Sequence, residues 1–330
     1  MASNLENACN FIINVSEGKT GEYGAGVTWS SVDGFIGNVY INEKNFLGRG
    51  QKLSLNWDFG GITNYSISFQ EPWLMGTELS LGIGLYDRSY KSKITSGGAE
   101  NEYNINKKGG NISLGYNLFG DWNGLIRCKI ENSIMELLGD NSTGSGIDKS
   151  RARSLTFQLD RDTSNHFFNP TSGAIDIFSI EYAGQLLGGD EDFTKYNIDL
   201  RRFYPTFGEN HAWSVRLKTG FSDGELSLLE KYCLGGPTVL RGYKPNAFTG
   251  TELLLIQLEY HVPIVEKIKG IIFVDVGNVW EGKEKIDLGD LHYSYGVGLR
   301  INSPFGIIKL EYGFSEQGTG ETQFGIGYPF

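Results

Sequence analysis

The amino-acid sequence predicts an all-β protein, a 16-stranded antiparallel transmembrane β-barrel. Apolar and polar residues alternate with period two along most of the 330 residues, the alternating segments number sixteen, and short breaks take turns with long ones. Alternation gives each strand one apolar and one polar face, which suits a wall between lipid and water. An even strand number, with short turns at one end and long loops at the other, is typical of bacterial outer-membrane barrels.

The individual strands follow from this alternation. Leu53, Leu55 and Trp57 stand at every second position, and polar residues fill the positions between them. We expect strands near residues 22–30, 34–41, 50–59, 63–71, 76–88, 109–118, 122–135, 150–163, 172–185, 193–204, 211–223, 251–262, 270–279, 292–302, 305–314 and 322–330. Many have the ~9–11 residues that a tilted strand needs to cross a bilayer. Tryptophans near strand ends are expected to be interfacial anchors: Trp29, Trp57, Trp73, Trp122, Trp213 and Trp280.

The breaks between strands form a short and a long class. Short breaks are expected at residues 72–76, 119–121, 205–210, 263–269 and 303–304, and long ones at 89–108, 136–149, 224–250 and 280–291. The break at 224–250 is a sixth outer loop in this count. Because it carries an arginine that can reach inward, we expect the loop to fold into the lumen and obstruct it.

Composition and charge narrow the function classes. The formal net charge is −10 and no basic run appears, so a nucleic-acid partner is not expected. Cys9, Cys128 and Cys233 are far apart and give neither a disulfide framework nor a metal-ligand spacing. A soluble β-sandwich or propeller is the alternative fold. The barrel is favoured because the polar strand faces suit a wet lumen and because no repeat of about 40 residues appears.

No residue pattern points to catalysis. A hydrolase needs a histidine within reach of a serine and an orienting acid. His261 shares a strand face with Glu259, but no serine stands at the matching position. The segment 235–237, Gly-Gly-Pro, neither matches a phosphate-binding loop nor opens a helix. We therefore expect a protein that is not an enzyme and that uses no cofactor and no metal.

Two acidic residues predict an ionic contact inside the barrel. If the hairpin after the twelfth strand turns near residue 266 or 267, Glu259 lies opposite or nearly opposite Asp275, with both side chains pointing inward. Carboxylates across a strand pair repel each other, so a cation is expected beside them. Arg241, in the preceding loop, is the candidate, because its planar guanidinium can donate to both acids. Two separately solvated acids are the alternative.

Two of these segments resemble motifs of a known family. Leu240, Arg241, Gly242 and Tyr243 resemble the Val/Ile-Arg-Gly-Phe/Tyr tip of the sixth outer loop in BamA-type outer-membrane insertases. Residues 273–280 resemble the family's thirteenth-strand motif, in which Phe273, Asp275 and Gly277 are the matching residues. The resemblance implies that Arg241 contacts Asp275 inside the barrel, with Glu259 as a further acidic partner.

Two more segments extend the resemblance to about residues 11–330. Residues 160–173 resemble the connection between strands eight and nine, and residues 323–330 are similar to the C-terminal β-signal of outer-membrane proteins. Residues 15–21 resemble the last strand of a periplasmic POTRA domain. We therefore expect residues 1–21 to hold an added start segment and the end of a truncated POTRA domain, and residues 22–330 to form the barrel.

The resemblance also implies a lateral gate between the first and last strands. Precursors would add their own C-terminal strand to the open edge, where main-chain hydrogen bonds give affinity. A weak seam is consistent with the sequence, because glycine weakens a strand and proline lacks an N–H group. The gate and β-signal residues are Gly24, Gly26, Gln323, Gly325, Gly327, Tyr328, Pro329 and Phe330.

Partners and location also follow from the resemblance. It implies an insertase in the outer membrane of a diderm bacterium that acts on unfolded outer-membrane β-barrel precursors and contacts the membrane lipids. Periplasmic assembly lipoproteins or chaperones would bind through the missing POTRA domains. Two alternatives stay open: a related translocation barrel, either TamA-like or a two-partner secretion transporter, and a passive porin-like channel.

Overall fold

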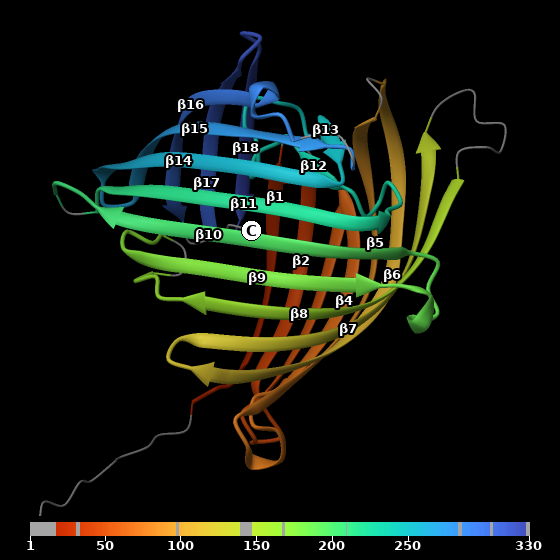
Figure 1. The fold of residues 1–330 in the computed structure, drawn as a ribbon. Coiled ribbons are helices and arrows are strands. Elements are labelled where there is room, and N and C mark those ends of the chain that lie inside the picture. The colour runs from red at the N-terminus through yellow and green to blue at the C-terminus, as the bar shows by residue number, and fades with distance from the viewer. Residues whose placement is uncertain are drawn as a thin grey trace, which may run out of the picture.

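The computed structural model describes residues 18–30, 34–96, 99–138, 147–166, 169–208, 210–282, 286–303 and 306–327. Within these ranges, sixteen antiparallel strands follow one another around a closed barrel, and β12 and β13 form a separate two-stranded sheet (Figure 1). The predicted fold class is therefore confirmed.

The elements have the following bounds. The barrel consists of β1 (Gly21–Ser30), β2 (Gly34–Phe46), β3 (Gln51–Gly60), β4 (Ile62–Glu71), β5 (Leu79–Ser96), β6 (Ala99–Phe119), β7 (Trp122–Leu138), β8 (Ile147–Asp162), β9 (Gly173–Ala183), β10 (Asp192–Pro205), β11 (Ala212–Glu225), β14 (Glu252–Val265), β15 (Ile268–Trp280), β16 (His292–Ser303), β17 (Gly306–Ser315) and β18 (Gly320–Gly327). The inner sheet consists of β12 (Tyr232–Leu234) and β13 (Phe248–Gly250), and the 3₁₀ turns are η1 (Leu74–Gly76), η2 (Gln185–Leu187) and η3 (Leu288–Asp290). None of the helices found in the described ranges is long and apolar enough to cross a membrane.

The main difference from the predicted strands concerns residues 89–108, which the sequence analysis assigns to a long loop. β5 and β6 instead stay paired as far as Ser96 and Ala99, whereas β4 accompanies β5 only to Tyr90. Past that point the exposed face carries polar residues such as Lys91 and Lys93, whereas Ile94 and Ile105 are buried. The exposed apolar positions therefore end although main-chain pairing continues. The prediction of a long loop there was wrong. β2 continues to Phe46, five residues past its predicted end, and the other described strand ends lie within three residues of their predicted positions.

The outer wall of the barrel carries a continuous apolar band. Phe157 lies opposite Ile180 on the next strand, and Ile180 lies opposite Tyr196. These three side chains remain 43–49% exposed, and Ile67 and Leu85 form a similar exposed pair on β4 and β5. Water-facing surfaces rarely expose apolar patches of such extent. The band is therefore the lipid-facing surface, and the polar strand faces line the lumen.

The tryptophans only partly follow the expected girdle. Trp57, Trp73 and Trp213 are exposed, as interfacial anchors should be. Trp280, however, is only 6% exposed, so its assignment as an anchor was wrong. It ends β15, where it is paired with Glu252 of β14. The side chain of Trp29 lies outside the described residues.

The strand ring closes at the seam between β1 and β18. In the described ranges 18–30 and 306–327, the register of this seam is given by one pair, Ser30 with Gly325. On its other side, β1 pairs with β2 along its whole length. β18 likewise pairs with β17 from Gly320 to Gly327. The seam is thus the least paired junction among the described barrel strands.

Candidate functional site

The connection between β11 and β14, here called loop 6, folds into the barrel. Its β12 and β13 pair with each other from Tyr232 to Gly250, so the segment between them turns back as a tip. Leu240 and Tyr243 of the tip pack in a buried cluster with Leu255 and Val279 of the barrel wall. These apolar contacts place the tip against β14 and β15, as the sequence predicts for the sixth outer loop.

Gly242 permits the close approach of the tip to β17. Its φ of +81° lies in the left-handed region, and a Cβ atom there would stand 3.0 Å from the carbonyl carbons of Gly313 and Phe314. A side chain at position 242 would therefore strain the backbone and collide with the wall. Gly277 on β15 has a related role, because a Cβ atom there would stand 2.5 Å from the main-chain oxygen of Leu254.

The guanidinium group of Arg241 binds both carboxylate oxygens of Asp275. Nε donates to Oδ2 and Nη2 donates to Oδ1, each at 2.7 Å, and the main-chain N–H of Arg241 donates to Oδ2 at 3.1 Å. The guanidinium carbon lies 3.6 Å from the centre of the Phe273 ring. Arg241 is 2% exposed and Asp275 is fully buried. The predicted Arg241–Asp275 contact is thus present in the structure as a bidentate, charge-assisted pair.

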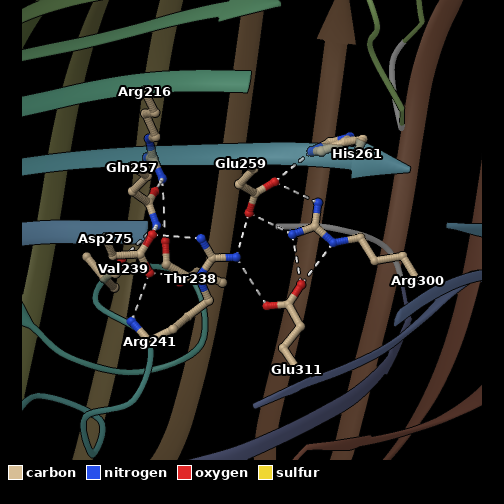
Figure 2. A network of polar contacts seen from close by, with 10 residues as sticks. All are labelled: Arg216, Thr238, Val239, Arg241, Gln257, Glu259, His261, Asp275, Arg300 and Glu311. Carbon is tan, nitrogen blue, oxygen red and sulfur yellow. Dashed lines mark hydrogen bonds and ion pairs between the residues drawn. The ribbon is translucent and has the colours of Figure 1, made fainter. Parts of the chain in front are cut away.

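A second arginine enlarges the site (Figure 2). Arg241 Nη1 also donates to Glu259 Oε1 at 2.5 Å and lies 3.5 Å from Glu311 Oε2. Arg300 donates to Glu259 at 2.9 and 3.1 Å, and to Glu311 at 2.8 and 2.9 Å. His261 Nε2 lies 2.8 Å from the other oxygen of Glu259. Two guanidinium groups and three carboxylates therefore form one network, here called the lumen ion cluster: Arg241, Arg300, Glu259, Asp275 and Glu311.

The charge of Arg241 is stabilised by its surroundings. Burial by itself would lower the pKa of the guanidinium, but the negative charge of Glu259 and the hydrogen bonds from Arg241 to Asp275 raise that pKa above its ordinary value. Buried charges are tolerated when each is paired and hydrogen-bonded, and removing one partner leaves another charge uncompensated. Each charge of the lumen ion cluster therefore depends on its partners.

The register of the β14–β15 hairpin refines the predicted pairing. Asp275 lies directly opposite Gln257, and Glu259 lies opposite Phe273. The two acids are thus nearly opposite, with the turn centred at residue 266. Gln257 contacts both loop 6 and Asp275. Its Nε2 donates to the main-chain oxygen of Val239 at 2.7 Å and lies 3.3 Å from Asp275 Oδ1.

Sequence reasoning missed Arg300 and Glu311 as members of the site. The alternation along 292–302 puts Arg300 on the lumen face, which is the only signal that the sequence offers for it. Its reach to Glu259 depends on the pairing of β14, β15 and β16. In the described part of the chain, no three His, Cys, Asp or Glu side chains converge in a way that could hold a metal ion.

The predicted gate residues that the structure describes lie on the two strands of the seam. Gly325 is the partner of Ser30 across it, and Gly24 and Gly26 belong to β1. A Cβ atom at position 24 would collide with the Tyr40 ring of β2, so this glycine also serves packing. Gln323 is buried and Gly327 ends β18. Tyr328, Pro329 and Phe330 lie outside the described residues.

The fold and the site together define an outer-membrane β-barrel whose sixth loop is anchored in the lumen by a buried arginine. Comparison with known proteins agrees with this class. The model of the Omp85 superfamily domain matches residues 45–330, and the chain belongs to that superfamily.

Curated relatives include a bacterial protein and a chloroplast protein. The outer membrane protein assembly factor BamA of Nitratidesulfovibrio vulgaris strain Hildenborough is 26% identical over 361 residues, which cover 98% of this chain and 44% of that protein. The chloroplastic outer envelope protein 80 of Arabidopsis thaliana is 23% identical over 357 residues, which cover 96% and 47%. The chain spans about half the length of these curated relatives.

Solved structures share the fold. BamA from Haemophilus ducreyi lacking POTRA domains 1–3 superposes with a TM-score of 0.80 at 19% identity and covers 95% of this chain and 71% of that one. CdiB from Acinetobacter baumannii gives a TM-score of 0.66 at 19% identity and covers 93% of this chain and 59% of that one. At such identities the likeness establishes the barrel architecture.

Proposed function

We propose that the chain folds and inserts β-barrel precursors into the outer membrane through a lateral gate between β1 and β18. The main support for the proposal is the short pairing of β1 with β18. In the described ranges, this junction has one residue pair, Ser30 with Gly325. Unpaired main-chain groups at a strand edge bind an incoming strand and are costly in hydrocarbon. A short seam lowers the number of hydrogen bonds that opening must break. The similarity to proteins named as outer membrane assembly factors supports the same reading.

In this proposal the lumen ion cluster holds loop 6 in place and takes no part in a chemical reaction. In this proposal no side chain serves as a nucleophile, and no cofactor takes part. Arg241 holds the loop 6 tip against β14, β15 and β17, the strands that precede the gate strand β18. Precursors bind to the β1 edge, and assembly lipoproteins or chaperones bind to POTRA domains that precede the barrel in the whole protein.

A translocation barrel is the second candidate. The similarity to CdiB favours it, because a TM-score of 0.66 shows that such barrels share this architecture. A translocator would pass a polypeptide through the lumen and would have to displace loop 6. An insertase needs the seam to open and leaves the loop in place.

A cross-link across the seam tests the insertase. The variant carries Ser30→Cys and Gly325→Cys and has the three native cysteines replaced by serine. Directly paired Cα atoms lie about 4.5–5.5 Å apart, within the range that a disulfide bridges. We expect oxidation to abolish precursor insertion into proteoliposomes by the protein with its POTRA domains, and reduction to restore it.

The matched control is a disulfide at a fully paired junction. Ser54 and Ser68 are Cα partners on β3 and β4, and replacing both by cysteine locks strands that need not part. Insertion by this control should be the same in oxidised and reduced form. Normal insertion by the oxidised Ser30–Gly325 variant would exclude lateral gating and favour translocation through the lumen.

A further inference from the structure

Loop 6 contacts the barrel at a second place, distant from Arg241. Its residues 227–232, here called the stem, follow β11 and precede the tip. The stem lies against the extended parts of β5, β6 and β7 and against β10, whereas Arg241 holds the tip against β14, β15 and β17. The tip also reaches β5, where Asn246 Nδ2 donates to Ser92 Oγ at 3.0 Å. Loop 6 therefore joins two different parts of the barrel wall.

The centre of the stem contact is a buried ion pair. Lys195 Nζ of β10 donates to Glu230 Oε2 at 2.7 Å, and the two side chains are 11% and 9% exposed. The ammonium also lies over the rings of Phe193 and Tyr232, at 4.8 and 5.8 Å from their centres. Cation–π contacts and a paired carboxylate together offset the loss of hydration of the lysine. A second ion pair, Lys129 with Glu181 at 3.0 Å, lies near enough to interact with both charges. Loss of either partner would leave the other buried without its direct hydrogen-bonded counter-ion.

Apolar packing surrounds this pair. Leu228 and Leu229 of the stem pack against a buried cluster in the β5–β7 wall. The cluster consists of Ile94, Ile105 and Met135. Two of these residues, Ile94 and Ile105, belong to the hairpin that the sequence analysis treated as a loop. The unexpected length of β5 and β6 thus supplies the wall on which the stem rests.

Hydrogen bonds tie the stem to two further elements. Glu191, in the connection before β10, accepts the main-chain N–H of Ser227 at 3.3 Å and the hydroxyl of Ser150 at 2.5 Å. The hydroxyl of Tyr232 donates to Asn197 Oδ1 at 2.9 Å. None of these bonds involves the lumen ion cluster. The stem contact can therefore persist when the tip contact is lost.

We propose that Lys195 and Glu230 form a second lock that holds loop 6 in the lumen independently of Arg241. Under this assignment they are positioning residues. The tip lock sets the loop against the wall near the gate, and the stem lock keeps the lumen obstructed. The inference goes beyond the proposed insertase function, because obstruction is measured without any precursor.

Conductance of purified barrels in planar lipid bilayers tests this inference. The variants are Arg241→Ala, Glu230→Lys and the two combined. Two independent locks each hold the loop when the other is absent, so each single variant should stay close to the native mean conductance. The combined variant should show a mean conductance at least about tenfold higher, because the closed population then has neither lock.

Charge reversal supplies the control. Lys195→Glu added to the combined variant restores an ion pair with its charges exchanged, and the mean conductance should fall back towards the native value. Lys108→Glu combined with Arg241→Ala breaks an exposed pair with Asp87, and it should leave the lumen obstructed. All variants are first shown to be folded by their altered gel migration before boiling.

Two results would overturn the inference. One is a fully open pore in Arg241→Ala alone, since the stem lock would then hold nothing. The other is an open pore that persists in the folded charge-reversed variant, since the ion pair would then be irrelevant. Conductance is measured without a precursor, so a failure of precursor insertion does not affect these results. The insertase proposal and the second-lock proposal can therefore be rejected independently.

Discussion

Arg241 shows at the scale of single residues why an arginine, and not a lysine, stands at the tip of loop 6. Its fork makes two parallel bonds to Asp275, and the remaining nitrogen reaches Glu259. The face of the same group rests on the Phe273 ring. A planar, delocalised cation can make all of these contacts at once. The tip is therefore fixed in direction as well as in position.

Replacing Arg241 by lysine should weaken the site although the charge stays. An ammonium cannot bind Asp275 at two points and reach Glu259, so buried acceptors lose donors, at a cost of about 1–3 kcal/mol. We expect a lower midpoint of urea unfolding in lipid vesicles and slower precursor insertion. Arg49→Lys, at an exposed position, should change the midpoint little. An unchanged midpoint in Arg241→Lys would contradict the bidentate role.

The sequence was sufficient for part of this site. Counting from the hairpin turn brought Glu259 and Asp275 together, and the need for a cation pointed to Arg241. Arg300 and Glu311 could not be found in this way. Arg300 binds Glu259, and Glu311 binds Arg300 and Arg241. These contacts depend on the register of several neighbouring strands and on a loop that enters from elsewhere in the chain. Such long-range pairings have no local signal.

At the scale of elements, loop 6 depends on a main-chain conformation as much as on charge. Gly235, Gly236 and Gly242 all have positive φ angles, which L-residues adopt at a cost of about 1–2 kcal/mol. At Gly242 the wall of β17 adds a steric limit. The tip can therefore carry its arginine to Asp275 only because the next residue has no side chain.

Gly242→Ala should displace the tip from the wall. The added methyl group would stand about 3 Å from main-chain carbons of β17, and we expect destabilisation and faster cleavage of loop 6 by protease. Gly48→Ala is the matched control. Gly48 has a similar φ of +71° but no atom within 4 Å of the added carbon, so it isolates the backbone cost. Equal cleavage of the two variants would show that the close approach to β17 is unimportant.

The strands themselves were largely predictable, for a physical reason. Where one face meets lipid and the other meets water, the hydrophobic pattern must have period two. The exception is instructive. Residues 91–96 and 99–105 stay paired without that pattern, because pairing needs only main-chain groups where no exposed face has to meet lipid. Alternation therefore reports the lipid-facing part of a strand and not its full length.

At the scale of the whole molecule, the barrel divides into a strongly and a weakly paired part. Loop 6 ties β14, β15 and β17 to β5, β6, β7 and β10 through the contacts of its tip and its stem. The seam between β1 and β18 stands apart from both contacts. Opening there leaves the loop attachments intact, so gating and obstruction of the lumen can be independent.

Hydrogen–deuterium exchange along β1 provides the last prediction. In an antiparallel sheet, successive main-chain N–H groups of a strand point to alternate neighbours. About half of those in β1 bind β2, which accompanies the strand from Gly21 to Ser30, and the other half point to the seam. We therefore expect two exchange classes in peptides from this strand, with the faster class exceeding the slower by at least about tenfold. β9, which is paired on both sides, should show one slow class. Uniformly slow exchange in β1 would mean that the seam is as firmly bonded as the other junctions, and lateral opening would then require a partner that separates the strands.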